Sequence, residues 1–338
     1  MKNRMTRIAL ARRPQGAPVA EDFAFDHMDL PDPAPGEVLV EVSHLSLDPY
    51  MRGRMNDVKS YAPSVGIGET MTGEGVGRVV ATNDPRFSVG DLVVGVTGWA
   101  THACLSGSAL RKLDDSLPPS TALGVLGMPG FTAWASLNAY GRPKAGQTLV
   151  VAAATGPVGS MVGQLAKAAG MRTVAIAGGA EKCRIATETF GFDAAIDHRA
   201  FDTASALHTA IAEAAPDGID IYFENVAGMV LEAVIPLLNT FARIPVIGTI
   251  AWYNELEDSA DRLPMLWRSV LVKRLSINGF IVYDHWDKFD TFLAEVGPKV
   301  AAGEIAYLED VVQGIDKMPA AFAALLEGGN TGKLVVEL

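Results

Sequence analysis

Residues 148–178 read TLVVAAATGPVGSMVGQLAKAAGMRTVAIAG, and this stretch decides the fold of the larger part of the chain. An apolar run leads into the turn ATGPVG, a segment of helical length follows, and a second apolar run comes next. Strands joined through a helix in this way lie parallel in one sheet. The turn has the spacing Ala154-x-Gly156-x-x-Gly159, in which glycines let backbone N–H groups and the positive helix end approach a pyrophosphate. The stretch therefore predicts a dinucleotide site within a βαβ unit.

The alternation of apolar runs and helix-length segments continues beyond this unit, with the runs AAIDH, IDIYFENV, IPVIGT and SINGFIV. Residues 1–117 follow another pattern, in which turn-forming clusters such as PDPAPG and NDPRFSVG separate short apolar runs. We predict an α/β protein with a Rossmann-type doubly wound parallel sheet at 123–311. A second, β-rich domain is expected from 1–122 together with 312–338.

The composition is that of a globular protein. Of its 338 residues, 49% are apolar and 20% are charged, close to the averages for folded soluble proteins. At about 150 residues per domain, the length indicates two domains. The net charge of −11 repels nucleic acid and anionic lipid, so neither is an expected partner. Only Cys104 and Cys183 occur, which excludes a disulfide framework and favours a cytoplasmic location. Prolines and glycines interrupt the two long uncharged stretches, and the basic N-terminus lacks a signal-peptide core, so no membrane segment is predicted.

The end of the second strand favours NADP(H) over NAD. An NAD enzyme places an acid there, about 20 residues past the glycine-rich turn, to bind the ribose 2′-hydroxyl. This chain has Gly178, Gly179 and Ala180, followed by the basic residue Lys182. A cation beside small residues suits a 2′-phosphate. The alternative is that Lys182 is a solvated surface charge, and that Glu181 only stabilises the N-terminus of the following helix through the helix dipole.

No metal site is predicted, because the six histidines form no HxxxH pair and no cluster with cysteine. Without a metal ion, hydroxyl donors must polarise the substrate carbonyl. Conjugated carbonyl compounds suit such a site, since hydride goes to the β-carbon while a few donors stabilise the enolate oxygen.

Several blocks carry a family resemblance: LDPYMRGRM, KSYAPS, GMPGFTAW, ATGPVGSMVGQLAK, FENVAG, FARIPVIG, GFIV and GGNTGK, in this order. The chain resembles the zinc-independent medium-chain reductases of the alkenal double-bond reductase and prostaglandin reductase (leukotriene B4 dehydrogenase) family. The resemblance covers nearly the whole chain and implies that the β-rich part is a GroES-like catalytic domain. Zinc-containing relatives have Gly-His-Glu where this chain has Thr72, Gly73 and Glu74, so Gly73 replaces a metal ligand.

The resemblance also implies which residues bind NADP(H). Met128 and Thr132 are expected near the nicotinamide. His198 stands where the family usually has a tyrosine beside the 2′-phosphate, which makes its contribution depend on pH. Ala227 replaces the usual glycine of FENVAG, a change expected to matter little. The full set is Met128, Thr132, Gly156, Pro157, Val158, Gly159, Lys182, His198, Asn225, Ile247, Gly248, Thr249, Tyr253, Phe280, Ile281, Val282 and Asn330.

Three tyrosines in loop-like segments are candidates for the substrate site: Tyr50, Tyr61 and Tyr253. A tyrosine hydroxyl stays protonated at neutral pH, so Tyr253 is our candidate catalytic donor to the substrate oxygen. Tyr50 and Tyr61 are expected to bind the substrate. For each ring, a structural role with a satisfied hydroxyl is the alternative. We expect Asp48 and Arg52, on either side of Tyr50, to form a structural ion pair.

The leading hypothesis is an NADPH-dependent reductase of the C=C bond of α,β-unsaturated aldehydes or ketones. Two alternatives remain open, an NADPH quinone reductase and a non-catalytic NADPH-binding redox sensor. Relatives are commonly dimers, and the run SINGFIV is able to pair across a two-fold axis, so a homodimer is expected.

Overall fold

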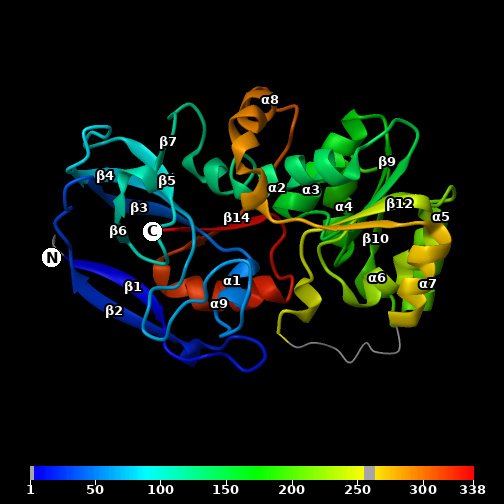
Figure 1. Cartoon of the computed structure of the whole chain (residues 1–338), viewed down its shortest axis with the longest axis horizontal. Coiled ribbons are helices and arrows are strands. Elements are labelled where there is room, and N and C mark those ends of the chain that lie inside the picture. Colours follow the sequence, from blue (N-terminus) through cyan, green and yellow to red (C-terminus); the bar gives the residue numbers. More distant parts are fainter. Residues whose placement is uncertain (1–3, 255–262) are drawn as a thin grey trace. The chain divides into compact units, whose positions relative to one another are not determined.

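The structure is a computed structural model that describes residues 4–254 and 263–338 (Figure 1). The chain forms two compact units. Unit 1 consists of Met1–Gly127 and Glu309–Leu338, and unit 2 of Met128–Leu308. From the sequence we expect domain boundaries at 122/123 and 311/312, and these remain predictions. The division into compact units falls at 127/128 and 308/309. No helix in the described part of the chain is long and apolar enough to cross a membrane.

Unit 2 contains a six-stranded sheet in the order β10-β9-β8-β11-β12-β13, and each neighbouring pair is parallel. This is the doubly wound order in which the chain starts at the centre, runs to one edge and then crosses to the other half. The predicted Rossmann-type sheet is confirmed. The strands are β8 (Thr148–Ala152), β9 (Arg172–Ala177), β10 (Ala194–Asp197), β11 (Ile219–Phe223), β12 (Leu238–Val246) and β13 (Ser276–Gly279).

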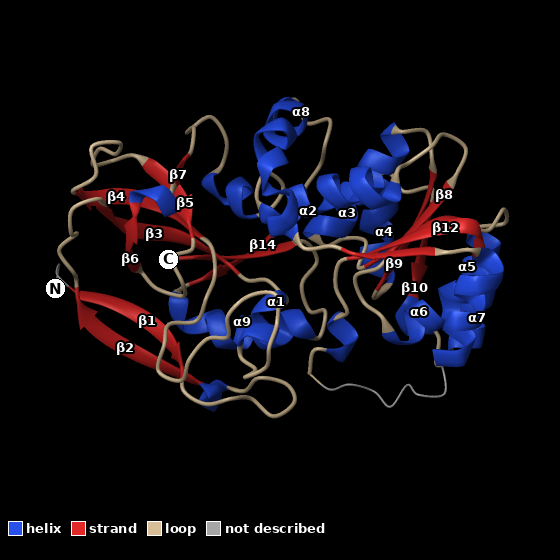
Figure 2. Ribbon diagram, viewed as in Figure 1, coloured by secondary structure: helices blue, strands red, loops and turns tan. Residues whose placement is uncertain are grey.

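Helices cover both faces of this sheet (Figure 2). Helices α2, α3 and α8 lie on one face, and α5, α6 and α7 on the other. Helix α4 packs against β9 and β10. The bounds are α2 (Met128–Ser136), α3 (Pro157–Ala168), α4 (Ala180–Glu188), α5 (Ala204–Ala214), α6 (Gly228–Val234), α7 (Leu263–Lys273) and α8 (Phe289–Ala301).

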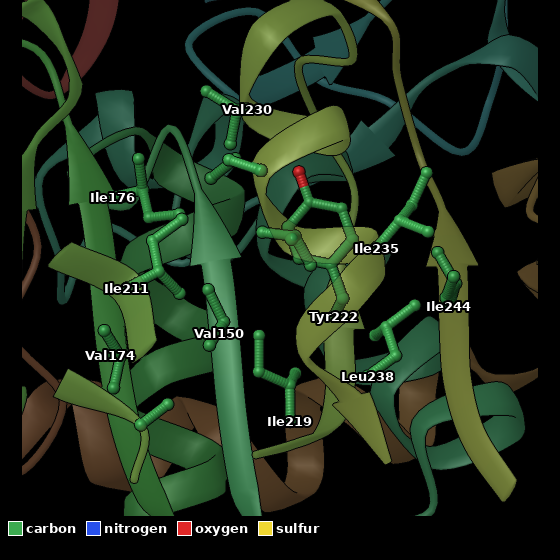
Figure 3. Close-up of a cluster of buried hydrophobic side chains, with 14 of the residues drawn as sticks. Val150, Val174, Ile176, Ile211, Ile219, Tyr222, Val230, Ile235, Leu238 and Ile244 are labelled. Atoms are coloured by element: carbon green, nitrogen blue, oxygen red, sulfur yellow. The ribbon is translucent and has the colours of Figure 1, made fainter. Parts of the chain in front are cut away.

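The core on one side of this sheet consists mainly of aliphatic side chains from the strands and from the covering helices (Figure 3). Val150, Leu207 and Ile219 are completely buried. Each such side chain contributes about 1.5–3 kcal/mol through the removal of apolar surface from water. Tyr222 is equally buried, and its hydroxyl donates to Glu224 at 3.2 Å. The packed strands therefore hold the loops at their carboxyl ends on a rigid base.

Unit 1 is β-rich, as the sequence predicts. Its seven-stranded sheet has the order β14-β15-β3-β4-β5-β7 with β6 also paired to β3, and β1 pairs with β2 in a separate hairpin-like sheet. The C-terminal strand β15 joins β3 in antiparallel pairing. The elements are β1 (Arg4–Leu10), β2 (Phe23–Asp29), β3 (Glu37–Ser46), α1 (Tyr50–Arg54), β4 (Gly75–Thr82), β5 (Leu92–Gly95), β6 (His102–Ser106), β7 (Arg111–Lys112), β14 (Glu309–Gln313), α9 (Met318–Leu326) and β15 (Lys333–Glu337).

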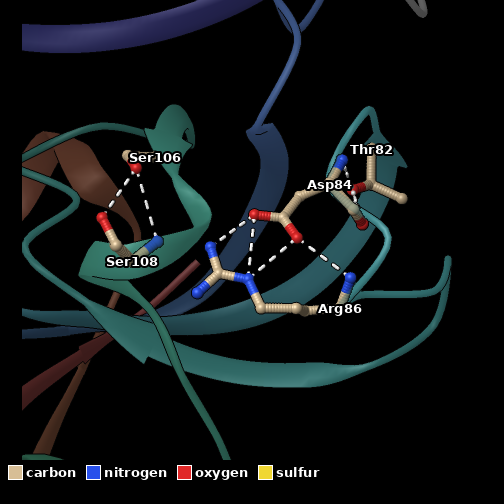
Figure 4. Close-up of polar contacts among 5 residues, drawn as sticks. All are labelled: Thr82, Asp84, Arg86, Ser106 and Ser108. Atoms are coloured by element: carbon tan, nitrogen blue, oxygen red, sulfur yellow. Dashed lines mark hydrogen bonds and ion pairs between the residues drawn. The ribbon is translucent and has the colours of Figure 1, made fainter.

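Two short polar motifs hold the turns at one end of this sheet (Figure 4). The Arg86 guanidinium donates to both carboxylate oxygens of Asp84, and this contact lowers the pKa of Asp84 to about 2. Ser106 accepts from the backbone N–H of Ser108 and caps the short helical turn after β6. These contacts belong to the predicted turn cluster NDPRFSVG and to the turn after β6, so we assign them a structural role.

Candidate functional site

The glycine-rich turn follows β8 and opens helix α3. Gly156 is the N-cap residue, Pro157 occupies the first turn, and no side chain caps the helix. The first backbone N–H groups therefore have no side-chain acceptor and lie at the positive end of the helix. A Cβ atom at Gly159 would lie 2.4 Å from the Ala153 carbonyl oxygen, so only glycine lets the helix pack this closely on the strand end.

Three basic side chains gather at the end of β9. A Cβ atom at Gly178 would lie 2.9 Å from Arg199 Nε and 3.1 Å from His198 Nε2, so both side chains stand directly over this glycine. The positive charge of Lys182 acts on His198. The sequence predicts Lys182 and His198 at this position. It does not identify Arg199, which follows the next strand, because only the packing of β10 beside β9 brings this residue to Gly178.

Asp197 orders this basic group. Its Oδ1 atom accepts from the backbone N–H of Gly179 at 2.7 Å and from that of Arg199 at 2.9 Å. Burial, and then the charge of Arg199, lower the pKa of His198, which favours the neutral form of its ring. An anion beside this ring would favour the protonated form and take up a proton.

The end of β11 connects three strands of the sheet. Asn225 Nδ2 donates to the Ala152 carbonyl at the end of β8, at 2.8 Å. The Glu224 carbonyl accepts from the backbone N–H groups of Ile247 and Gly248, which follow β12. The expected cofactor residues Asn225, Ile247 and Gly248 therefore lie together at the carboxyl edge of the sheet, where ligands bind in folds of this kind.

The Glu224 side chain supports the next turn from within the core. Its Oε1 atom accepts from the backbone N–H groups of Val226 and Ala227 at 2.7 and 2.8 Å, and also from Tyr222. Its Oε2 atom is buried and has no partner in the described residues. Burial raises the pKa of Glu224. The sequence pattern does not single out this carboxyl group.

Ala227 has an unusual backbone conformation. Its backbone has φ 68° and ψ −152°, a conformation that glycine adopts freely and that L-residues rarely adopt. From the sequence, the replacement of the family's usual glycine is expected to matter little. The observed conformation is one in which an L-residue is strained relative to glycine, and the expectation that the replacement matters little stays a prediction.

Tyr253 lies in the same part of unit 2. A Cβ atom at Gly248 would lie 3.2 Å from Tyr253 Oη and 3.3 Å from the Asn225 carbonyl oxygen. The candidate donor therefore sits beside two other expected cofactor residues.

Phe280, another expected cofactor residue, is buried and stacks on His285 with ring centroids 5.0 Å apart, and its backbone N–H donates to the carbonyl oxygen of Val246.

The remaining expected residues of unit 2 lie at its N-terminal helix and after β13. Thr132 is buried in α2, and its hydroxyl donates to the sulfur of Met128 at 3.7 Å. Ile281 and Val282 follow Phe280 and are half-buried. Their roles at a nicotinamide remain predictions.

Unit 1 carries the other two candidate tyrosines. The Arg54 guanidinium carbon lies 5.6 Å from the Tyr50 ring centroid and 4.4 Å from that of Tyr61. The structure thus brings Tyr50 and Tyr61 together around one cation, whereas Tyr253 belongs to unit 2.

A buried ion pair fixes the segment before Tyr50. Lys333 Nζ lies 3.1 Å from Asp48 Oδ1 and also donates to the carbonyl oxygens of Leu47 and Leu334. Ser46 donates to the other oxygen of Asp48. Asp48 therefore has the structural role that the sequence predicts, but the ion pair that anchors it is formed with Lys333 of β15 and not with the expected partner Arg52.

Asn330 lies in unit 1, just before β15. Its side-chain amide donates to the Gly332 carbonyl at 2.6 Å. The neighbouring backbone N–H groups of Thr331 and Gly332 donate to Asp310. This local network orders the GGNTGK segment.

Large side chains occupy the position of the missing zinc ligand. A Cβ atom at Gly73 would lie 3.0 Å from Met51 Cε and 3.2 Å from Trp99 Cδ1, and both side chains are completely buried. A histidine would not fit there without displacement of this packing. Within residues 4–254 and 263–338, no group of three or more His, Cys, Asp or Glu side chains is placed to hold a metal ion.

Comparison with known proteins places the chain in a family. It matches two family profiles, "N-terminal domain of oxidoreductase" at residues 6–113 and "Zinc-binding dehydrogenase" at residues 157–297. It is 51% identical to the NADPH-dependent curcumin reductase of Escherichia coli (100% of this chain and 98% of that protein). It is 41% identical to the NADP(+)-dependent 2-alkenal reductase of Nicotiana tabacum (89% and 87%).

The chain belongs to the alkenal double-bond and prostaglandin reductase family. A solved structure of this kind, CurA of Vibrio vulnificus in complex with NADPH, superimposes with a TM-score of 0.92 at 51% identity and covers 98% of both chains. The predicted family and the predicted combination of a Rossmann-type sheet with a GroES-like domain are confirmed. In this chain, the packing of Trp99 and Met51 leaves little room for a side chain at Gly73.

Proposed function

We propose that this protein is an NADPH-dependent reductase of the C=C bond of α,β-unsaturated aldehydes and ketones. The observation that carries the proposal is the basic group of Lys182, His198 and Arg199 at Gly178, at the strand end where an NAD enzyme has an acid. The names of its relatives, an NADPH-dependent curcumin reductase and an NADP(+)-dependent 2-alkenal reductase, support the same cofactor and reaction type.

The residues of unit 2 fit this dinucleotide. The uncapped N-terminus of α3 and the close turn at Gly156 and Gly159 suit a pyrophosphate. Lys182 and Arg199 suit the dianionic 2′-phosphate, and a phosphate beside His198 would favour the protonated form of its ring. NADPH, when bound, supplies the hydride.

Tyr253 would stabilise the charge that develops on the substrate. Hydride addition at the β-carbon moves an electron pair toward the carbonyl oxygen, and a hydroxyl aimed at this oxygen stabilises the enolate. The Tyr253 hydroxyl lies beside Gly248 and Asn225, among the residues assigned to the cofactor. Protonation of the α-carbon then completes the reduction. We assign Tyr50 and Tyr61 to the binding of the substrate.

Consumption of NADPH tests the proposal directly. The purified protein is mixed with NADPH and an enone, a quinone or buffer alone, and the absorbance of NADPH is followed. Turnover with the enone, with the saturated ketone as product, supports the proposal. Turnover with the quinone alone favours the quinone reductase, and binding of NADPH with no turnover favours the redox sensor.

We also propose that the protein is a homodimer in the cytoplasm. Strand β13 is an edge of the sheet, with pairing only to β12 among the described residues, and Trp267 and Leu271 of α7 are exposed. An open strand edge beside exposed apolar side chains suits pairing with a second copy. Cys104 and Cys183 are not in disulfides, which fits a reducing compartment. Sedimentation analysis tests the dimer.

A further inference from the structure

The carboxyl group of Glu224 lies beside the turn that carries Asn225, and the proposed mechanism does not use it. Glu224 follows β11 directly and is 2% exposed. Its Oε1 atom accepts from the backbone N–H groups of Val226 and Ala227, whereas Oε2 is buried with no partner among the described residues. An unpartnered buried oxygen costs free energy that an apolar side chain of the same size would avoid. This cost indicates a function other than packing, and the contacts of Oε1 show where the group acts.

Glu224 binds this turn from a fixed position. Its backbone N–H donates to the carbonyl oxygen of Pro245 in β12 at 3.0 Å, and the hydroxyl of the fully buried Tyr222 donates to its Oε1 atom at 3.2 Å. The turn includes Ala227 at φ 68° and ψ −152°, and an L-residue keeps such a conformation only where its surroundings impose it. The acceptor that Glu224 offers to the Ala227 N–H is one such constraint.

The segment at residues 247–253 is attached to the same turn through its main chain. The carbonyl oxygens of residues 224–226 accept backbone N–H groups of this segment at distances of 2.9 to 3.4 Å. The donors are Ile247, Gly248, Ile250 and Ala251. The segment ends at Tyr253, our candidate donor to the substrate oxygen. One buried carboxyl group therefore supports both the turn of Asn225 and the segment of Tyr253.

We propose that Glu224 is a positioning residue for hydride transfer, which holds the turn at 225–227 and, through this turn, the segment that carries Tyr253. This inference rests on the proposed function. The phosphates of the cofactor are assigned to other parts of unit 2, the N-terminus of α3 and the basic group at Gly178. Loss of the Glu224 acceptor should therefore misplace the reacting groups more than it weakens the binding of NADPH.

Two variants of Glu224 test this separation of turnover from binding. Glu224→Met keeps the length of the side chain and removes both oxygens, and it should lower kcat for 4-phenyl-3-buten-2-one about 10- to 100-fold. The Kd of NADPH, measured by fluorescence titration, should change less than about threefold. Glu224→Gln keeps an acceptor oxygen, so its kcat should stay within about threefold of the wild type. Leu207→Ala is the matched control, because Leu207 is completely buried in the core of the same unit; this variant should lower the melting temperature and leave kcat unchanged.

Hydrogen exchange tests the same support without turnover. In the protein without cofactor, the backbone N–H groups of residues 247–251 should exchange at least about tenfold faster in Glu224→Met than in the wild type. Leu207→Ala, compared at the same interval below its melting temperature, should show no selective increase in this segment.

Unchanged exchange at 247–251 in Glu224→Met, or a kcat no lower than that of Leu207→Ala, would overturn the proposal, and so would equal losses of kcat and of NADPH affinity. If Glu224→Met does not fold, native-state exchange of the wild type in low concentrations of urea decides. Residues 226–227 and 247–251 should then open as one cooperative unit, and opening of 247–251 while the turn stays protected would overturn the proposal. A wild type that reduces no enone overturns the proposed function, whereas the exchange experiments still test the support that Glu224 provides.

Discussion

Replacement of Ala227 by glycine tests whether the turn after β11 is strained. At φ 68° and ψ −152°, an L-residue costs about 1–3 kcal/mol relative to glycine. Two effects oppose the gain. Loss of a buried methyl group costs about 0.8 kcal/mol, and the greater freedom of glycine in the unfolded chain costs about 0.4–1 kcal/mol. We therefore expect Ala227→Gly to change the free energy of unfolding by no more than about −1 to +2 kcal/mol.

Ala233 of helix α6 provides the matched control. It is 1% exposed, as Ala227 is, but it lies within a regular helix. Ala233→Gly loses a similar methyl group and helix propensity with no strain to relieve, so it should destabilise unit 2 by about 1–2 kcal/mol. The difference between the two variants isolates the strain at Ala227, which we expect to be about 1–3 kcal/mol.

Urea unfolding followed by tryptophan fluorescence is a suitable assay, because four of the five tryptophans lie in unit 2. The hydrogen bond from the backbone N–H of residue 227 to Glu224 is kept in the glycine variant, so the turn should retain its conformation. Equal destabilisation by Ala227→Gly and Ala233→Gly would refute the assignment of strain.

Four further predictions concern the proposed activity. Lys182→Ala and Arg199→Ala should each raise the KM for NADPH about tenfold or more and leave the KM for NADH nearly unchanged; equal use of both cofactors by the wild type would contradict the 2′-phosphate site. The pKa of His198 is lowered in the free protein, so the binding of NADPH should be accompanied by the uptake of a proton. The affinity of the wild type for NADPH should therefore rise relative to that of His198→Gln as the pH falls from 7 toward 6. Calorimetry in buffers of different ionisation enthalpy measures this proton uptake. Tyr253→Phe should lower kcat about 100-fold with little change in melting temperature, and a kcat within a few fold of wild type would remove Tyr253 from the mechanism. Exhaustive treatment with EDTA should leave turnover unchanged, and stoichiometric bound zinc with EDTA-sensitive activity would overturn the metal-independent mechanism.

The sequence by itself determines the Rossmann-type part of this protein. Apolar runs of strand length separated by helical segments are local patterns, and they depend only on which residues must be buried along one short stretch. Gly159 illustrates the agreement, since its spacing in the motif predicts a close approach that the structure shows at the Ala153 carbonyl. The absence of an acidic residue at 178–180, which favours NADP(H) over NAD, is likewise a feature of one short stretch of sequence. The sheet, the turn and the expected cofactor type therefore follow from short stretches of sequence alone.

Only the tertiary structure decides which distant residues become neighbours. Arg199 reaches Gly178 because β10 pairs beside β9, and Lys333 reaches Asp48 because the C-terminal strand pairs with β3. The strain at Ala227 is a backbone property that arises where Glu224 binds the turn from within the core. Arg54 appears in the sequence as one more basic residue of DPYMRGRM, and only the tertiary structure brings its guanidinium against the rings of both Tyr50 and Tyr61. Such contacts follow from strand register and packing across the whole unit, which no local pattern encodes.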